Sequence, residues 1–412
     1  MKCIIDNQIV LSQAPEGPLA ARIEPFARSL REQGYTRSSI HRQVLLATGF
    51  SRWLKQRGVV LRSITSDHPR WYLRCRARLV RPCRGDAAAL RHLLNFLRSD
   101  GMIPAEKLPA RSLTPAERCA QAYEQHLREA RGLAPATIVN YIPFVQSFLK
   151  DRFGGGSVTL PHLCARDVVG FVQRQAPRLH PKRAKLLTSA LRSFLQYVRY
   201  RGQVKLDLAA AVPVVANWSR SSIPRAIAAD QVRQLLASID RRTAVGRRDY
   251  AILLLLSRLG LRSSEVVFLE LDDIDWNAGQ LRVCGKTGQR SDLPLLPEVG
   301  QAIATYLRRG RPHSTSRRVF LRAKAPIGGF RGPCGIGSIV RHCLQRAGLK
   351  APTCGAHQFR HGLATEMLRQ GTSLGEIGEL LGHRSPETTK IYTQVDLDAL
   401  RTLALPWPGG VR

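Results

Sequence analysis

Four polar side chains near the C-terminus have the chemistry needed to attack and stabilise a phosphodiester. His357 and Arg360 lie three residues apart, on one face at the start of an expected helix. His383 directly follows the end of the next expected helix, and Tyr392 lies one helix further on. A tyrosine hydroxyl becomes a nucleophile when nearby charge helps it to ionise, and arginine donates paired hydrogen bonds to phosphate oxygens. These residues predict a site for phosphoryl transfer, provided that the fold brings the helices together.

Three short helices must position these side chains. Apolar residues at helical spacing precede Gly371 in the first and Gly382 in the second, and glycine commonly follows a helix end because it accepts a left-handed conformation. Ser385 and Pro386 begin the third helix, with serine as the N-cap and proline at the first helical position. The polar residues therefore gather at the junctions between helices.

The motifs around these residues resemble those of the tyrosine recombinase (phage integrase) family. The pattern His-x-x-Arg-His begins at residue 357, Leu-Gly-His ends at residue 383, and Thr-Thr-x-x-Tyr-Thr begins at residue 388. Upstream, residues 256–276 are similar to the family's first-arginine motif, and residues 280–295 are similar to its lysine hairpin. The motifs occur in the family's order, so the resemblance covers about residues 228–400.

The resemblance implies a role for each residue that matches a family motif. Tyr392 would attack the scissile phosphate, giving a 3′-phosphotyrosine and a free 5′-hydroxyl. Lys286, at the hairpin tip, would protonate the leaving 5′-oxygen. The pentavalent phosphorane would be stabilised by four residues, Arg262, His357, Arg360 and His383, and the two histidines could instead exchange the tyrosine proton. Because the phosphotyrosine bond conserves the energy of the cleaved bond, we expect no cofactor.

Two further residues are expected to support this site. Glu265 either holds Arg262 in place or is an ordinary carboxylate at a helix start, and the sequence leaves both interpretations open. His361 follows Arg360 and lies four residues after His357, a spacing that also occurs in metal-binding helices. Since no third ligand is evident, we expect no metal and interpret His361 as a residue that packs beside the catalytic groups.

The composition favours a protein that binds nucleic acid. The 412 residues include 64 Lys+Arg and 30 Asp+Glu, a formal net charge of +34, and such a surplus binds a polyanion by releasing counterions. The longest apolar run, residues 250–256, is too short to span a bilayer, and the N-terminus lacks the pattern of a signal peptide. Nine cysteines without C-x-x-C pairs indicate a reducing compartment. We therefore expect a soluble protein of a bacterial-type cytoplasm, associated with the nucleoid.

The predicted fold is mainly α with a small β-hairpin or sheet. It comprises two helical N-terminal modules that resemble DNA clamps and a mixed α+β tyrosine-recombinase catalytic domain. The predicted boundaries are 1–112 for the first module, 113–215 for the core-binding helical domain, 216–227 for a linker, and 228–412 for the catalytic domain with its C-terminal tail.

The two helical modules look like copies of one unit. Residues 89–101 and 190–202 match at a constant offset of 101, including Gly101 and Gly202 at their ends. The second module opens with a capping box at residues 114–117. The first module could be an arm-site domain, a second DNA clamp or a partner-docking domain, and the sequence does not decide between these.

Basic residues on the last helix of the core-binding domain are expected to face DNA phosphates: Lys182, Arg183, Lys185 and Arg192. The segment 314–337, rich in Arg, Gly and Pro, is expected to approach DNA or a neighbouring subunit. The resemblance implies double-stranded DNA at specific recombination sites as the partner, bound by a homo-oligomer of four protomers. The amphipathic tail after Tyr392 would dock onto an adjacent subunit or in cis. Accessory proteins could join this complex, and no membrane partner is expected.

Several function classes compete for these features. The favoured class is a site-specific recombinase that integrates, excises or transposes a mobile element. A strand relaxer of the type IB topoisomerase class would share the site chemistry, but the short tail and the core-binding module count against it. A DNA-binding protein with an inactive recombinase fold is disfavoured because the set of matching residues is complete. A metal-dependent nuclease would need carboxylate clusters that the sequence does not contain.

Overall fold

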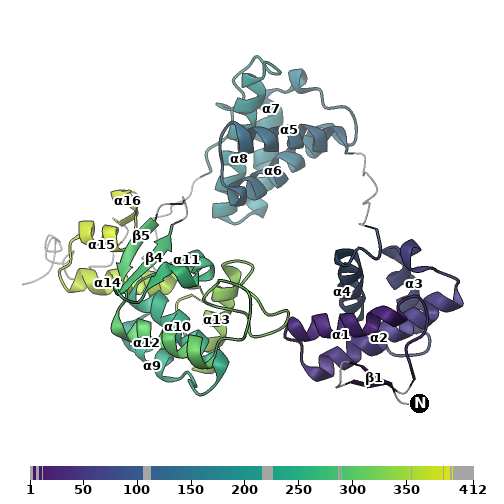
Figure 1. Cartoon of the computed structure of the whole chain (residues 1–412). Helices are drawn as coiled ribbons and strands as arrows, with labels where there is room; N and C mark the ends of the chain where they lie inside the picture. The colour runs from purple at the N-terminus through teal and green to yellow at the C-terminus, as the bar shows by residue number, and fades with distance from the viewer. Residues whose placement is uncertain are drawn as a thin grey trace, which may run out of the picture. The chain divides into compact units, whose positions relative to one another are not determined.

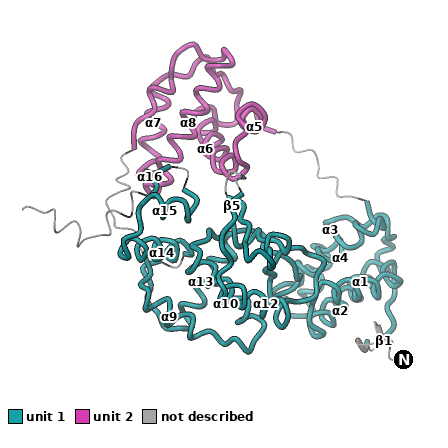
Figure 2. Tube along the Cα trace, turned by 60° about the vertical axis from the view of Figure 1, so that its left-hand side comes forward, with its two compact units in different colours: residues 1–106, 222–412 teal, residues 107–221 magenta. Residues whose placement is uncertain are grey.

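The structure, a computed structural model, divides into two compact units. Unit 1 combines residues 1–106 with residues 222–412, and unit 2 comprises residues 107–221 (Figure 2). The residues that the structure describes are 3–5, 9–11, 13–104, 113–215, 226–285, 288, 290–353, 355–383, 385–389 and 392. Most of the predicted linker, residues 216–225, therefore lies outside the described residues, and the predicted domain boundaries stay predictions.

Unit 2 is a bundle of four α-helices around an aromatic core (Figure 1). Its first helix begins with the predicted capping box, in which Thr114 Oγ1 accepts from the Glu117 backbone N–H (3.2 Å) and Glu117 Oε2 accepts from the Thr114 backbone N–H (2.8 Å). Tyr123, Phe148 and Phe194 are fully buried in the core. The helices are α5 (Pro115–Glu129), α6 (Pro135–Phe153), α7 (Ala165–Gln175) and α8 (Pro181–Tyr200), with 3-10 turns at Leu160–His162 and Ala176–Arg178.

The N-terminal part of unit 1 has a core of its own. Two short antiparallel strands, with Cys3 opposite Leu11, precede four helices that enclose Phe26 and Phe50. The elements are β1 (Cys3–Ile5), β2 (Ile9–Leu11), α1 (Ile23–Glu32), α2 (Arg37–Gln56), α3 (Asp67–Arg76) and α4 (Asp86–Ser99), with 3-10 turns at Ala20–Arg22 and Leu61–Ser63.

The two helical modules share one order of α-helices, from α1 to α4 and from α5 to α8, although the 3-10 turn at Ala176–Arg178 between α7 and α8 has no counterpart between α3 and α4. Each has a first helix, a long second helix, a 3-10 turn, a third helix of ten or eleven residues and a final helix. The matched pair Leu90 and Leu191 is buried in both modules, and Gly101 and Gly202 both have φ of 69° just past the final helix. The strands β1 and β2 have no counterpart in the described part of unit 2. Duplication stays a prediction, and this shared order supports it.

The C-terminal part of unit 1 is a helical domain with a small sheet, which confirms the predicted mixed fold. Every residue of α10 from Ala251 to Leu256 is fully buried, as a helix that is apolar on all sides must be. The antiparallel sheet has the order β3-β4-β5. The elements are α9 (Ala229–Ala237), α10 (Ala244–Arg258), α11 (Ser263–Phe268), a 3-10 turn (Leu271–Asp273), β3 (Ile274–Asp275), β4 (Gln280–Cys284), β5 (Arg290–Pro294), α12 (Pro297–Arg309), α13 (Cys334–Arg346), α14 (His357–Arg369), α15 (Leu374–Leu380) and α16 (Pro386–Thr389).

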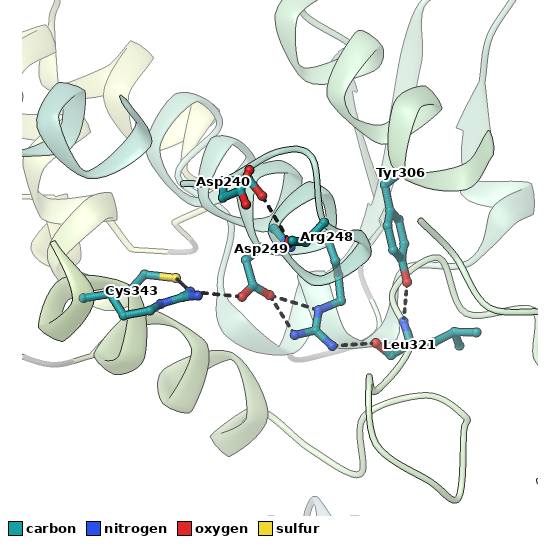
Figure 3. A network of polar contacts seen from close by, with 9 residues as sticks. Asp240, Arg248, Asp249, Tyr306, Leu321 and Cys343 are labelled. Carbon is teal, nitrogen blue, oxygen red and sulfur yellow. Dashed lines mark hydrogen bonds and ion pairs between the residues drawn. The ribbon is translucent and has the colours of Figure 1, made fainter. Parts of the chain in front are cut away.

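A buried polar network ties α10 to the segment between α12 and α13 (Figure 3). Arg248 donates to Asp249 Oδ1 from Nε (3.0 Å) and Nη2 (2.7 Å), and from Nη1 to the Leu321 carbonyl (3.0 Å). The Leu321 N–H in turn donates to Tyr306 Oη (3.2 Å), and Arg346 lies 3.6 Å from the second Asp249 oxygen. This network fixes the middle of a segment that has no α-helix or named strand of its own. Whether that segment approaches DNA or another subunit stays a prediction.

In the part of the chain that the structure describes, no helix is both long and apolar enough to cross a membrane.

Candidate active site

The start of α14 brings one predicted arginine into the interior of the domain. α14 begins at His357, so Arg360 lies within its first turn, and its side chain is buried. Arg360 Nη1 donates to the Gly260 carbonyl (2.8 Å), and Nη2 donates to the Leu381 carbonyl. Gly260 has φ of 59°, and a Cβ there would lie 2.8 Å from a Leu381 methyl. Only glycine therefore fits this position without strain or displacement.

Arg262 is the N-cap residue of α11, and Glu265 holds it in place. Glu265 Oε2 accepts from the Arg262 backbone N–H (2.7 Å), while Oε1 accepts from Arg262 Nη1 (2.7 Å). One carboxylate thus binds both the backbone at the helix start and the arginine side chain. These contacts fit both interpretations of Glu265, as a group that holds Arg262 and as a carboxylate at a helix start. Nη2 of Arg262 also donates to the Gly382 carbonyl (3.3 Å).

The two arginines therefore converge on one turn, at the end of α15. Both donate to backbone carbonyls at residues 381 and 382, which carry only partial negative charge. Burial, and next the neighbouring positive charge of Arg262, lower the pKa of Arg360 to about 10. Two cations with one carboxylate between them favour the binding of a further anion. This arrangement suits a phosphate group.

Tyr392 is almost completely enclosed beside these arginines, at 1% exposure. Its ring packs in a small apolar cluster with Ala364, Ile377 and Leu381, and its hydroxyl lies 3.1 Å from Nδ1 of His361. Burial raises the pKa of Tyr392, while the charges of Arg360 and Arg262 act in the opposite direction. The hydroxyl is therefore a protonated phenol at neutral pH.

Of the remaining histidines, His383 lies beside the tyrosine and His357 lies beside His361. The His383 ring stacks near the Tyr392 ring, with centroids 6.4 Å apart, and its Nδ1 lies 2.8 Å from Thr389 Oγ1. Burial, then Arg360 and Arg262, lowers the pKa of His383 to about 4. Partial burial and Arg360 also lower the pKa of His357. Both imidazoles are thus neutral at pH 7, so each can donate one hydrogen bond and accept another.

A cavity of about 940 Å³ opens next to these groups. Arg262, Arg360 and His383 line one side of it, and Val283, Gly285 and Leu293 of the β4–β5 hairpin line another. Lys286, the predicted proton donor, lies outside the described residues. Its neighbour Gly285 lines the cavity, so the chain enters the hairpin tip at the edge of the candidate site.

The predicted DNA-facing residues of α8 differ in their contacts. Lys182 and Lys185 are exposed, and the exposed Arg183 guanidinium lies 4.9 Å from the centre of the Phe144 ring. Arg192 instead donates from Nη2 to the carbonyls of Val212 (2.8 Å) and Pro213 (3.2 Å), which ties the segment after α8 to the bundle. Arg192 therefore has an intramolecular structural contact that its spacing did not indicate.

Among the described residues, no group of three or more His, Cys, Asp or Glu side chains could hold a metal ion. The absence of a metal nevertheless stays a prediction, as does the absence of a cofactor.

The comparisons with known proteins agree with the geometry. The sequence profile of the phage integrase family matches residues 225–398, a range that contains every residue predicted to be catalytic. An integrase/recombinase of Sinorhizobium fredii, y4rA, is 59% identical over 409 residues, covering 99% of both chains. The chain belongs to the phage integrase family. It is an enzyme of the tyrosine recombinase class, the DNA strand-transferases.

Other members of the phage integrase family extend this similarity. The tyrosine recombinase XerD of Mycobacterium tuberculosis is 32% identical over 306 residues, covering 70% of this chain and 96% of XerD. A structure of XerH bound to a palindromic difH substrate superposes with a TM-score of 0.57 at 20% identity, covering 70% of this chain and 84% of XerH. Lambda integrase (residues 75–356), a dimer bound to a COC' core site, gives a TM-score of 0.53 at 17% identity, covering 67% and 94%. At these identities the two structures show the fold alone.

The family motifs identified the residues but not all of their contacts. The sequence predicts His361 to be a packing or supporting residue, and the structure places its Nδ1 at hydrogen-bond distance, 3.1 Å, from the Tyr392 hydroxyl. The signal available in the sequence was its position next to Arg360. Adjacent residues on a helix point in different directions, so the residue after the buried Arg360 can meet a different group, here Tyr392.

Proposed function

We propose that this protein is a site-specific DNA recombinase that cuts and rejoins strands through a 3′-phosphotyrosine intermediate. Tyr392 is the nucleophile, and Lys286 protonates the leaving 5′-oxygen. Four side chains stabilise the phosphorane: Arg262, His357, Arg360 and His383. The observation that carries the proposal is the convergence of two arginines and two histidines, His361 and His383, around one enclosed tyrosine, with His357 beside His361.

The arginines act as preorganised donors. Charge on the nonbridging phosphate oxygens grows as the phosphorane forms, and fixed guanidinium groups stabilise that charge without reorganising. The carbonyls of Leu381 and Gly382 occupy some of these donors in the DNA-free state. A bound phosphate carries a full negative charge and competes well for them. The same groups then stabilise the reverse reaction, in which a 5′-hydroxyl attacks the phosphotyrosine.

We further propose that the substrate is duplex DNA, held by four protomers at specific recombination sites. The net charge of +34 and the exposed basic residues of α8 support DNA binding. Relatives supply precedents, namely a lambda integrase tetramer bound to a Holliday junction and a Tn1549 transposon integrase in complex with a circular intermediate DNA. By analogy, the biological role is integration, excision or transposition of a mobile element in a bacterial cytoplasm. The tail after Tyr392 would dock onto a neighbouring protomer.

The test is to trap the covalent intermediate. A nicked duplex made from the DNA that flanks the gene is incubated with protein in EDTA, and the products are separated on a denaturing gel. The wild type and a Tyr250→Phe control should give a protein–DNA band that Tyr392→Phe lacks. The Tyr250 control is suitable because that residue lies on α10, away from the site, and its ring contacts Arg241.

Each other outcome has a defined meaning. Tight binding without a band on any flanking duplex would indicate a DNA-binding protein with an inactive fold. A band that persists in Tyr392→Phe would assign another nucleophile. Relaxation of supercoiled plasmid by a monomer, without strand exchange between two sites, would indicate a topoisomerase-like relaxer.

A further inference from the structure

The hydroxyl of Tyr392 meets a histidine that the family motifs left without a catalytic role. Its oxygen lies 3.1 Å from Nδ1 of His361, and the two ring centroids are 5.7 Å apart. His383 stacks on the tyrosine ring instead, and its own Nδ1 faces Thr389. The His357 ring centre lies 6.4 Å from that of His361. Among the described residues, His361 is therefore the histidine placed to exchange a proton with the tyrosine.

The surrounding charges suit a proton acceptor. Burial lowers the pKa of His361, and His357 and Arg360 lower it further, so the imidazole is neutral at pH 7. With its proton on Nε2, the neutral ring presents a lone pair on Nδ1 to the hydroxyl. Arg360 and Arg262 both favour the negative charge that develops on the tyrosine oxygen.

We propose that His361 is a catalytic residue whose Nδ1 takes the proton of Tyr392 as the tyrosine attacks phosphorus. This inference rests on the proposed function. The Oη–H bond breaks and the proton moves to the Nδ1 lone pair, while the Oη–P bond forms. The P–O5′ bond breaks at the same centre, and the 5′-oxygen takes a proton from Lys286. In religation the 5′-hydroxyl gives its proton to the neutral Lys286 amine as the P–O5′ bond forms again, the Oη–P bond breaks, and the imidazolium returns its proton to Oη.

The competing explanation is that the hydrogen bond only holds Tyr392 in its enclosed position. The two roles predict opposite effects of removing the histidine. A residue that restrains the tyrosine slows cleavage, so its loss should accelerate the reaction. A general base contributes about 10²–10⁴-fold to the rate, so its loss should slow the reaction by that factor.

The experiment measures single-turnover formation of the covalent complex on the nicked duplex. His361→Asn keeps an oxygen near the position of Nδ1 but cannot accept a proton. Its rate should fall about 10²-fold or more while DNA affinity is unchanged, and the exposed His342→Asn control on α13 should match the wild type. A 5′-bridging phosphorothiolate substrate, whose thiolate leaves without protonation, should rescue Lys286→Ala but not His361→Asn.

Two further readouts separate a chemical role from a structural one. Added imidazole should restore cleavage in His361→Ala, with a rate that depends on the pKa of the imidazole used. The cleavage rate of the wild type should also rise as the pH passes through the pKa of His361 in the DNA complex. In His361→Asn this rise of the rate with pH should be absent. The other titratable groups that influence the His361–Tyr392 pair are His357, Arg360, Arg262 and His383, and all four remain in the variant.

Wild-type or faster cleavage by His361→Asn would overturn the proposal, and a faster rate would assign His361 to restraint of the tyrosine. Rescue of His361→Asn by the phosphorothiolate would place its role on the leaving-group side. If the proposed function is wrong, the wild type itself should form no covalent complex. That result differs from a defect limited to His361→Asn, and it would also refute this inference.

Discussion

Replacing Glu265 by glutamine should weaken both the folded state and the chemistry. The Glu265 side chain is 4% exposed and binds Arg262 at 2.7 Å, whereas the Arg262 side chain is 27% exposed. Removing one partner from a fully buried ion pair costs about 3–5 kcal/mol. Because Arg262 is partly hydrated and glutamine retains one acceptor oxygen, we expect about 1–3 kcal/mol, a loss of roughly 2–10 °C in Tm for a domain of this size.

The chemical effect follows from the loss of orientation. Removing a preorganised donor to developing charge costs about 10²–10³-fold in rate, so loosening Arg262 should cost less, about 10- to 100-fold. The assay is the single-turnover rate of covalent complex formation, measured together with Tm. Because Glu265 acts through Arg262, cleavage should fall more than the affinity for the uncleaved duplex.

The chain contains a matched control in the ion pair of Arg258 and Glu298. It has the same separation of 2.7 Å, but the Glu298 side chain is 46% exposed and that of Arg258 is 42% exposed. Glu298→Gln should therefore change stability by less than about 1 kcal/mol and leave cleavage unchanged. If Glu265→Gln behaves like Glu298→Gln in both assays, the assignment of Glu265 as the group that positions Arg262 is wrong.

Three other changes test the same geometry. Gly260→Ala should lower the free energy of unfolding by about 1–3 kcal/mol, because the φ of Gly260 is 59° and the new methyl would lie 2.8 Å from Leu381. Chemical denaturation measures this change, and an unchanged denaturation midpoint would contradict this packing. The pKa of His383 is about 4 in the folded state and about 6.5 in the unfolded state. Between pH 6.5 and pH 4 the unfolded state therefore binds more protons than the folded state. The free energy of unfolding of the protein without DNA should fall as the pH drops through this range. His383→Asn should flatten that decline in a Tm-against-pH series, and an unchanged slope would exclude the effect. Asp249→Asn should lower Tm far more than Asp240→Asn, because Asp249 pairs with the buried Arg248 and Asp240 pairs with the exposed Arg242. Equal decreases in Tm would refute this reasoning.

Local signals in the sequence predicted most of the site's framework. Capping residues and glycines mark helix ends through backbone geometry that depends on few neighbours, which is why Gly371 and Gly382 were found as turns, both with positive φ. The hairpin expected within residues 280–295 is confirmed by the antiparallel strands β4 (Gln280–Cys284) and β5 (Arg290–Pro294). These features follow from the periodicity of apolar residues and from the residues that favour turns.

Tertiary contacts could not be predicted in this way. The contact between His361 and Tyr392 joins a residue of α14 to one beyond α16, and it depends on the tertiary packing of Tyr392 in a cluster with Ala364 and Ile377. The binding of Arg192 to carbonyls twenty residues later likewise depends on how the chain folds back after α8. Neither contact has a fixed sequence spacing, so no motif could report it.

The hydrophobic cores of the two helical modules and of the C-terminal domain have no described residue in common. The hydrophobic core of unit 2 lies within residues 116–212. Arg262 and Arg360 belong to the C-terminal domain, which has a separate core. A cassette exchange of unit 2 for that of a relative, with junctions near residues 107 and 221, would therefore leave the packing beneath those arginines intact. Such a chimaera would therefore measure how much of the preference for a DNA site resides in residues 107–221.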